Sequence, residues 1–408
     1  MAFIHPFEGH VVAPEWAGAV VAPAYDSLTP EERRQYADRH PENYLNAMRS
    51  ADEYASAEAP ALSAILKRNA RFVRRYVEAG RFIAQPPCVI VYRLASQGHV
   101  QRGVVAEMSI GAYLDGRIRR HEFTRVARED ALARYIDHVR TASSPVALAY
   151  RADEGIRERI DTATGTKPAV SLTTDDGVEH DIWVVSGTDA RALVDAFESV
   201  SSAYLTDGHH RCAATARFST AGADARLLVV LFPHDELRIL PYHRVVRDLG
   251  GHTTESFLTR LSESFEVEPL PGDDTGAAQP RARGEFAVHV DGRWYRFRLA
   301  GNEARPPEPA DSIDAAILQA RVIGPLIGIP DPRNDERLGY MAGAGGLDPL
   351  ERACREDWRA AFALHPTSMA ELAAVADAGQ VMPPKSTWFD PKPRSGFFMH
   401  DPLRLCGN

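Results

Sequence analysis

The sequence predicts an α+β protein, because short apolar runs typical of strands alternate along the chain with segments of helical periodicity. The chain has 408 residues, of which 44% are hydrophobic, so it can bury one large core or two ordinary ones. Its composition shows no bias toward disorder. We therefore expect a globular protein in which a sheet and helices share a core.

A helix is predicted to begin at Pro30. Thr29 supplies a hydroxyl for the N-cap, Pro30 takes the first helical position, and Glu31 and Glu32 place acids in the first turn. These devices together favour the start of a helix, so we expect one here.

Two apolar runs, 88–92 and 104–110, predict strands, and Asp115-Gly116 predicts a turn after the second. The pair His121-Glu122 follows that turn. A helix of about three turns comes next, because apolar residues then recur at helical spacing. Its buried stripe consists of Leu132, Tyr135, Ile136 and Val139. Glu122 is therefore expected in a loop between sheet and helix.

A strand, loop, helix, strand unit is predicted around Asp207. The runs 182–185 and 227–232 predict buried strands that flank a helix opening at Asp207, and the second run leads toward 240–244. Further on, 286–290 and 295–299 alternate on either side of Asp291-Gly292, which predicts a β-hairpin.

The segments around that hairpin are expected to be irregular. Residues 271–284 and 304–309 are rich in turn-forming residues and predict loops. Helical periodicity resumes at Ser312, and its apolar positions are Ile313, Ile317 and Val322.

Charge and cysteine content restrict the partners and the compartment. The formal net charge of -9 argues against a general nucleic-acid binder, since affinity for the phosphate backbone comes from clustered Lys and Arg. The cysteines Cys88, Cys212, Cys354 and Cys406 show neither close pairs nor metal-ligand spacing. The sequence has no basic leader followed by an apolar run and no apolar stretch long enough to span a bilayer. We expect a cytoplasmic protein without nucleic-acid or membrane partners.

Residues 207–211, Asp-Gly-His-His-Arg, open an alanine-rich helix. The first backbone N–H groups of a helix lack partners, and the aligned peptide dipoles leave partial positive charge there. Asp207 is expected as the N-cap, Gly208 permits close approach of the backbone to a ligand, and Arg211 can engage phosphoryl oxygens bidentately. Both a phosphate site and a surface helix with a charged first turn fit these residues.

The segment that ends in Asp-Gly-His-His-Arg resembles the signature of the ParB/sulfiredoxin-like nucleotide-binding folds, in particular the free serine kinases of that superfamily. Over essentially the whole chain, the sequence also resembles the family known as domain of unknown function 1015. The motifs of that family occur here in order, with alanine at position 24 in place of the usual second proline. They are Pro23-Ala24-Tyr25-Asp26, Arg102-Gly103, His121-Glu122-Phe123-Thr124, Leu240-Pro241-Tyr242-His243-Arg244 and residues 382–392.

The resemblance implies an α+β fold whose ParB/sulfiredoxin-like core of mixed sheet and helices is extended at both ends. We expect this nucleotide-binding core, with its N-terminal extension, over 1–250. A small α/β insertion that contains the hairpin is expected over 251–310. A C-terminal helical segment and the Met-Pro-Pro-Lys-Ser-Thr loop, which packs back on the core, are expected over 311–408.

The same resemblance implies transfer of a phosphoryl group from ATP or ADP to the hydroxyl of a small metabolite, foremost free L-serine, to give O-phosphoserine. It implies Glu122 as the catalytic base, Asp207 as a ligand of Mg²⁺ or of the acceptor, and His210 as a further catalytic residue. The other residues expected to contact the nucleotide are Gly208, His209, Arg211, His243, Arg244, Lys385, Ser386 and Thr387.

Two other interpretations remain open. A metal-dependent hydrolase of a phosphorylated metabolite would hold Zn²⁺ or Mn²⁺, although adjacent helical histidines diverge by about 100° and no His-x-x-His spacing is present. Its candidate ligands are His121, Glu122, Asp207, His209, His210 and His243. A nucleotide-binding regulator without turnover would use the same phosphate site, and the oligomeric state is open in all three interpretations.

Overall fold

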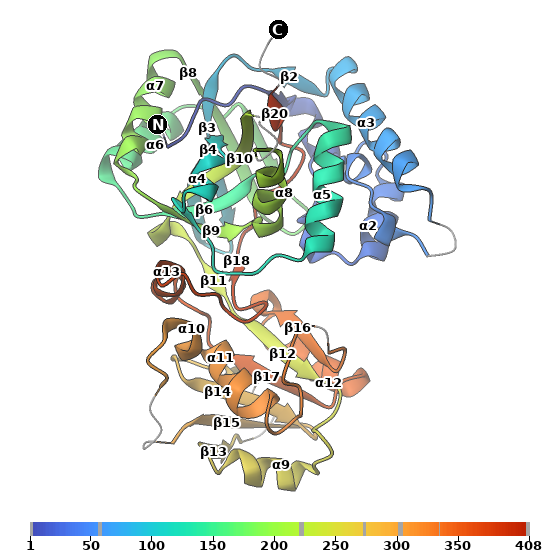
Figure 1. The fold of residues 1–408 in the computed structure, drawn as a ribbon, viewed down its shortest axis with the longest axis vertical. Coiled ribbons are helices and arrows are strands. Elements are labelled where there is room, and N and C mark those ends of the chain that lie inside the picture. Colours follow the sequence, from blue (N-terminus) through green and yellow to red (C-terminus); the bar gives the residue numbers. More distant parts are fainter. Residues whose placement is uncertain are drawn as a thin grey trace. The chain divides into compact units, whose positions relative to one another are not determined.

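The structure is a computed structural model that describes residues 3–55, 59–219, 224–271, 275–300, 305–333 and 335–404. The chain divides into two compact units. Unit 1 is formed by Met1–Arg119, Phe123–Leu237 and Pro391–Asn408, and unit 2 by Arg120–Glu122 and Arg238–Asp390. Each unit combines sheets with helices (Figure 1), so the predicted α+β class is confirmed.

Unit 1 is built on a mixed sheet that has nine strands among the described residues. These strands are β3 (Cys88–Ser96), β4 (His99–Ser109), β5 (Ile118–Arg119), β6 (Val146–Tyr150), β7 (Val170–Thr173), β8 (Glu179–Ser186), β9 (Ala203–Asp207), β10 (Asp224–Pro233) and β20 (Leu403–Arg404). Their order is β5-β9-β6-β10-β4-β3-β8-β7, and β20 pairs with β10. The pairs β6/β10 and β5/β9 are parallel, whereas β10/β4 and β3/β8 are antiparallel.

The remaining elements of unit 1 are a small sheet and the helices. The small sheet has the order β19-β1-β2, formed by β19 (Phe398–Met399), β1 (His10–Val12) and β2 (Phe82–Ala84). The helices are α1 (Ala17–Val20), α2 (Pro30–Arg39), α3 (Leu62–Glu78), α4 (Gly111–Leu114), α5 (Val126–Val139), α6 (Glu154–Thr164), α7 (Gly187–Ala196) and α8 (His209–Ser219). Helices α5 and α8 lie side by side (Figure 1).

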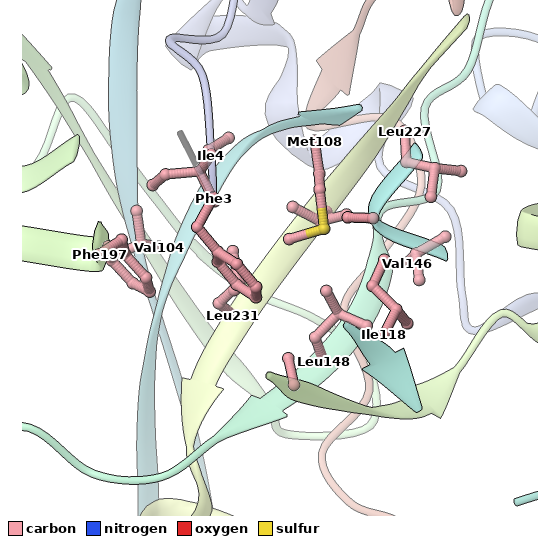
Figure 2. Packing of buried hydrophobic residues seen from close by; sticks show 14 of the residues in the cluster. Phe3, Ile4, Val104, Met108, Ile118, Val146, Leu148, Phe197, Leu227 and Leu231 are labelled. Carbon is pink, nitrogen blue, oxygen red and sulfur yellow. The ribbon is translucent and has the colours of Figure 1, made fainter. Parts of the chain in front are cut away.

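The large sheet of unit 1 is buried on both faces. Alternate residues of β10 point in opposite directions, so that Leu231 joins one hydrophobic cluster and Val230 the other. Figure 2 shows the first cluster, in which Phe3 and Phe197 pack with side chains of the sheet, among them Val104 and Leu231. Strands buried on both faces read as continuous apolar runs, which is why 88–92 and 227–232 were predictable.

Unit 2 is built on an antiparallel sheet with six strands among the described residues, in the order β13-β15-β14-β17-β12-β16. These are β12 (Tyr242–Val246), β13 (Phe265–Pro269), β14 (Glu285–Val290), β15 (Arg293–Leu299), β16 (Leu338–Ala342) and β17 (Ala360–Leu364), and a separate pair is formed by β11 (Ile239–Leu240) and β18 (Trp388–Phe389). The helices are α9 (Thr254–Leu261), α10 (Pro309–Ser312), α11 (Asp314–Leu318), α12 (Asp348–Glu356) and α13 (Met369–Asp377).

Some of the local predictions for unit 2 are confirmed, and others are not. The hairpin is confirmed as β14 and β15, with Asp291 and Gly292 in the turn at φ of 49° and 73°. The helix expected from Ser312 is interrupted, because α10 ends there and α11 starts at Asp314 and continues as a π-helical turn over 319–323. The predicted loop at 271–284 contains a 3-10 turn at Thr275–Ala278. Parts of both predicted loops, at 272–274 and 304, lie outside the described residues.

The two units are divided differently from the predicted ranges 1–250, 251–310 and 311–408. Strand β12 pairs with β17 and β16, strands that lie far along the chain, so it belongs to unit 2. Residues 391–404 belong to unit 1, where β20 pairs with β10 and β19 with β1. These pairings are long-range, and the local sequence pattern does not specify them.

The structure describes three of the four cysteines. Cys88, Cys212 and Cys354 are free thiols, and Cys406 lies outside the described residues. In the described part of the chain, none of the helices has the length and apolar character that crossing a membrane requires.

Candidate functional site

The junction between β9 and α8 places the Asp-Gly-His-His-Arg motif. Asp207 is the last residue of β9, Gly208 has a positive φ of 102°, and α8 begins at His209. The sequence analysis did not predict β9, although its Ala-Tyr-Leu-Thr run is apolar and β-prone. The strand matters because it fixes the point at which the chain turns into the helix.

Two cations meet the carboxylate of Asp207. The Arg211 guanidinium donates a hydrogen bond to Asp207 Oδ2 from one helical turn away. Lys392 Nζ lies 3.7 Å from Asp207 Oδ1, and only 12% of the Lys392 side chain is exposed. Lys392 belongs to the C-terminal motif, but it was absent from the predicted site residues. The signal that could have identified it is the motif itself, because lysine is rare in this chain outside the motif.

Arg211 is held in a fixed orientation by backbone carbonyls. Its Nη1 donates to the carbonyl oxygens of Ser144 at 2.8 Å and Pro145 at 2.7 Å. A Cβ on Gly208 would lie only 3.0 Å from the Arg211 guanidinium. Because Gly208 has no side chain, the Arg211 guanidinium has room to lie beside it. Gly208 would therefore assist a ligand only indirectly, by allowing Arg211 to take this position.

The two adjacent histidines have different surroundings. His209 is buried, whereas Nε2 of the half-buried His210 accepts a hydrogen bond from the Arg125 backbone N–H at 3.0 Å. Burial lowers the pKa of His210, and the nearby cation of Arg128 lowers it further. His210 is therefore neutral at neutral pH, with the acceptor role of Nε2 assigning the proton to Nδ1.

The start of α8 is rich in positive charge. Arg125 and Arg128 face His210 from the start of α5, and Arg211 and Lys392 face Asp207. The hydroxyl of Thr206, buried next to Asp207, has no hydrogen-bond partner within the described residues. A helix N-terminus with cations beside it is an arrangement suited to an anion.

Unit 2 contains the remaining predicted residues, and Arg244 contacts the loop that carries Lys385. Arg244 is buried on β12 and donates to the carbonyl oxygens of Lys385 at 3.0 Å and Pro384 at 3.1 Å. Burial lowers its pKa to about 10, so it remains cationic at neutral pH. Its guanidinium positions the loop around Lys385, which has a positive φ of 57°.

The side chains of that loop have partners within unit 2. Lys385 Nζ lies 3.3 Å from the hydroxyl of Tyr242, and Ser386 Oγ donates to its own loop at the Pro383 carbonyl, 2.7 Å away. Thr387 Oγ1 lies 3.4 Å from His121 Nε2, which brings the loop beside the His121-Glu122 pair.

His243 is buried in the sheet of unit 2 as a neutral ring. Its Nδ1 accepts a hydrogen bond from the Leu364 backbone N–H at 3.3 Å. Burial, together with the neighbouring Arg244, lowers the pKa of His243 to about 4. The imidazole thus adds no positive charge at neutral pH.

The structure therefore places the predicted residues in two groups. Residues 207–211 lie together in unit 1 with Lys392, and Glu122, His243, Arg244 and residues 385–387 belong to unit 2. Across the described ranges, no group of three or more His, Cys, Asp or Glu side chains is arranged to hold a metal ion. The first shell expected for a metal hydrolase is thus not found in that part of the chain.

The fold and the first group define the chain as an α+β protein with a cationic helix start at the end of a mixed sheet. Residues 4–316 match the model of the family described as protein of unknown function DUF1015, and the chain belongs to this family. No curated protein sequence matches the chain.

Several solved structures show weak similarity to this chain. A free serine kinase in complex with AMP has 13% identity and a TM-score of 0.38, with 70% of this chain and 86% of that chain covered. A conserved hypothetical protein from Pyrococcus furiosus has 11% identity and a TM-score of 0.35, with coverage of 72% and 93%. SbnI with C-terminal truncation from Staphylococcus aureus has 12% identity and a TM-score of 0.38, with coverage of 71% and 85%. Similarity this weak assigns neither an activity nor a ligand to this chain.

Proposed function

We propose that the protein is a nucleotide-dependent phosphotransferase that phosphorylates the hydroxyl of a small metabolite in the cytoplasm, with free L-serine as the leading acceptor. The observation that carries the proposal is the contact of Arg211 and Lys392 with Asp207, which precedes the first turn of α8. This turn lies in the segment that resembles the nucleotide-binding signature.

The phosphates of ATP or ADP would bind at the start of α8. The N–H groups of the first turn and the cations Arg211 and Lys392 are the donors that phosphoryl oxygens prefer. The carbonyl oxygens of Ser144 and Pro145 already fix the Arg211 guanidinium, so little side-chain entropy would be lost when a phosphate binds. His210, whose Nε2 accepts from Arg125, would contribute its Nδ1–H as a neutral donor.

Asp207 fits a role as the protein ligand of Mg²⁺. Magnesium is commonly bound through one or two carboxylates together with nucleotide phosphates, and it keeps several water ligands. A single carboxylate at the start of α8 meets that requirement, and the ion would supply charge neutralisation to the phosphates. The cations that flank Asp207 in this structure would then be shared between the carboxylate and the phosphates.

Glu122 is proposed as the base on the resemblance of His121-Glu122 to the serine kinases. In the transfer, the bond between the terminal phosphorus and its bridging oxygen breaks, and a bond from the acceptor hydroxyl oxygen to phosphorus forms. The hydroxyl proton passes to the Glu122 carboxylate. Lys385, Ser386 and Thr387 are retained as further proposed contacts of the nucleotide.

The test is calorimetric titration of ADP and ATP into the wild type and Asp207→Asn, with and without Mg²⁺. Without Mg²⁺, we expect Asp207→Asn to bind ADP more tightly, since Arg211 and Lys392 lose a competing carboxylate. With Mg²⁺, the wild type should gain affinity and the variant should gain much less. Asp189→Asn, an exposed acid on α7, is the charge-matched control. Equal responses of both variants to Mg²⁺ would contradict the role of Asp207.

Glu122→Gln separates an enzyme from a nucleotide-binding regulator. A kinase should lose turnover and keep its affinity for the nucleotide, whereas a regulator without turnover should change little. Glu78→Gln, an exposed acid on α3, controls for the loss of one charge. Retained turnover in Glu122→Gln would contradict the proposed base.

A further inference from the structure

A cavity of about 560 Å³ lies within unit 2, away from every predicted site residue. One wall is the end of the β14/β15 hairpin, with His289 and Trp294, and another is formed by α12, with Glu351 in its first turn and Arg355 in its last. Trp358, which follows α12, also lines the cavity. The volume falls in the range of small-molecule sites, about 300–1,000 Å³.

His289 lines this cavity and carries a buried nitrogen that has no partner among the described residues. The residue is 5% exposed, and its Nδ1 has no hydrogen-bond partner within the described residues. Its ring lies 5.0 Å from the Trp294 ring, its cross-strand neighbour. Burial keeps the pKa of His289 below its ordinary value, so the ring is neutral at neutral pH. A buried nitrogen of this kind costs free energy until a ligand or water bonds it.

The charged side chains at the cavity form two pairs, each of one carboxylate and one guanidinium. Glu351 Oε1 accepts from the Trp294 indole N–H at 2.8 Å, which leaves Oε2 facing Arg355 Nη1 at 3.6 Å. At the hairpin turn, Asp291 Oδ2 accepts from Arg359 Nη2 at 3.1 Å. The distance between Glu351 and Arg355 is too long for a hydrogen bond, so each group keeps capacity for a further partner.

Two tryptophans, Trp294 and Trp358, line the cavity. The indole of Trp294 is 3% exposed and is held by its bond to Glu351. The Trp358 ring packs closely on Gly339 on one side, and the Arg247 guanidinium lies 4.5 Å from its centroid. Rings fixed in this way favour a planar ligand, because stacking then costs little side-chain entropy.

We propose that this cavity binds a small zwitterion with a planar ring, of the class of aromatic and heteroaromatic α-amino acids. The ligand carboxylate would pair with Arg355, its ammonium with Glu351 Oε2, and its ring would lie against Trp294 and Trp358 with an N–H directed at His289 Nδ1. The site is independent of the proposed phosphotransferase site.

Other ligand classes match the cavity less well. A purely apolar molecule would leave His289 Nδ1 without a hydrogen-bond partner and would give Glu351 Oε2 and Arg355 nothing beyond their mutual contact in a partly desolvated site. A polyanion such as a nucleoside triphosphate would be repelled by Glu351 and Asp291, and a simple cation by Arg355 and Arg359. A net-neutral ligand with separated charges matches both pairs.

The test uses L-tryptophan and three analogues that each lack one group. Tryptamine lacks the carboxylate, indole-3-propionate lacks the ammonium, and L-phenylalanine lacks the ring N–H. Binding is measured by calorimetry, and the site is identified by the indole N–H signals of Trp294 and Trp358 in ¹⁵N-labelled protein, assigned with Trp358→Phe. The variants are Arg355→Gln, at an exposed position, and Arg352→Gln, an exposed residue of the same helix outside the cavity, as the control.

We expect L-tryptophan to bind and to shift both indole signals, and tryptamine and indole-3-propionate to bind at least about tenfold more weakly. Arg355→Gln should weaken L-tryptophan by about tenfold and leave tryptamine unchanged, while Arg352→Gln should change neither. The proposal is overturned if L-tryptophan shows no saturable binding up to about 10 mM. It is equally overturned if indole-3-propionate binds as tightly as L-tryptophan, or if both arginine variants behave alike.

Discussion

Asp207 stands between two cations, and this arrangement decides what the start of α8 can bind. Arg211 comes from the same helix and was predictable from the motif, because residues four apart on a helix are neighbours. Lys392 comes from the C-terminal segment, and its contact with Asp207 depends on how distant parts of the chain pack. The sequence motifs therefore predicted which residues belong to this site better than they predicted which of these residues contact one another.

The roles of single residues were harder to predict than their identities. Arg244 was expected to contact phosphate, yet it is buried and donates to carbonyl oxygens of its neighbouring loop. His243 was expected to contact the nucleotide, and burial makes its ring neutral at neutral pH. Burial depends on how the whole chain folds, so a short polar motif does not indicate whether its side chains are buried.

Lys392→Met should weaken ADP binding by about tenfold, because a partly buried cation that pairs with a carboxylate would also pair with a phosphate. The affinity is measured by calorimetry at fixed ionic strength. Lys67→Met, which removes the same charge from the exposed face of α3, should leave it unchanged. Equal losses in the two variants would reduce the effect to net charge alone.

Acid should destabilise unit 2 partly through His243. Its pKa is about 4 in the folded state and about 6.5 when unfolded, so the unfolded chain binds the proton more readily. The stability contributed by the neutral ring is complete above the unfolded pKa and is lost as the pH falls toward the folded pKa. Between about pH 7 and pH 5, the wild type should lose about 2 kcal/mol more than His243→Asn, which keeps an acceptor for the Leu364 N–H.

Urea unfolding at both pH values, followed through signals of unit 2, provides the measurement. A Cε1–H resonance of His243 that fails to move above about pH 5 would support the same account. If the wild type and His243→Asn lose equal stability on acidification, burial of His243 does not control this pH dependence.

At the scale of elements, local chemistry specified helix starts well. Thr29 accepts from the Glu32 N–H at 3.3 Å, and Glu32 accepts from the Thr29 N–H at 2.8 Å, so the predicted helix begins with a complete capping box. The same box at Ser368 and Glu371 starts α13 and was not predicted, although its Ser-x-x-Glu spacing is visible in the sequence.

Thr29→Ala and Ser368→Ala should each reduce the free energy of unfolding by about 1 kcal/mol, since each leaves a helix N–H without its acceptor. Denaturant titration provides the measurement, and Thr29→Ser and Ser368→Thr are the controls that keep the hydroxyl. If an alanine variant is as stable as its hydroxyl control, the cap contributes nothing at that helix.

The hairpin shows why some strands were predictable and others were not. Asp291 and Gly292 form a turn with positive φ at both positions, which Asp-Gly favours, and the flanking alternation is local. Strand β9 is short and pairs with β6 and β5, so its existence depends on distant segments. The break between α10 and α11 also escaped prediction, because apolar spacing alone does not mark a change of helical geometry.

At the scale of the whole molecule, unit 2 is nearly one continuous segment with adjoining ends. Ile239 pairs with Phe389 in β11/β18, and the Asp390 N–H donates to the Arg238 carbonyl at 3.1 Å. We expect the fragment 238–390 to fold alone, because its sheet and hydrophobic cluster are internal to it. Dispersed amide NMR signals and cooperative denaturation of the fragment are the expected results, and a collapsed spectrum would show that unit 2 depends on the rest of the chain.

Phosphorus NMR can detect phosphoryl transfer to a small hydroxyl compound directly. Purified protein is incubated with Mg²⁺, ATP or ADP, and a pool of hydroxy amino acids that contains L-serine, beside Asp207→Asn and Glu122→Gln. We expect a new phosphomonoester signal at the position of O-phosphoserine with the wild type. We expect no such signal with either variant. Nucleotide binding without any new signal from either donor would contradict the phosphotransferase and leave a nucleotide-binding regulator.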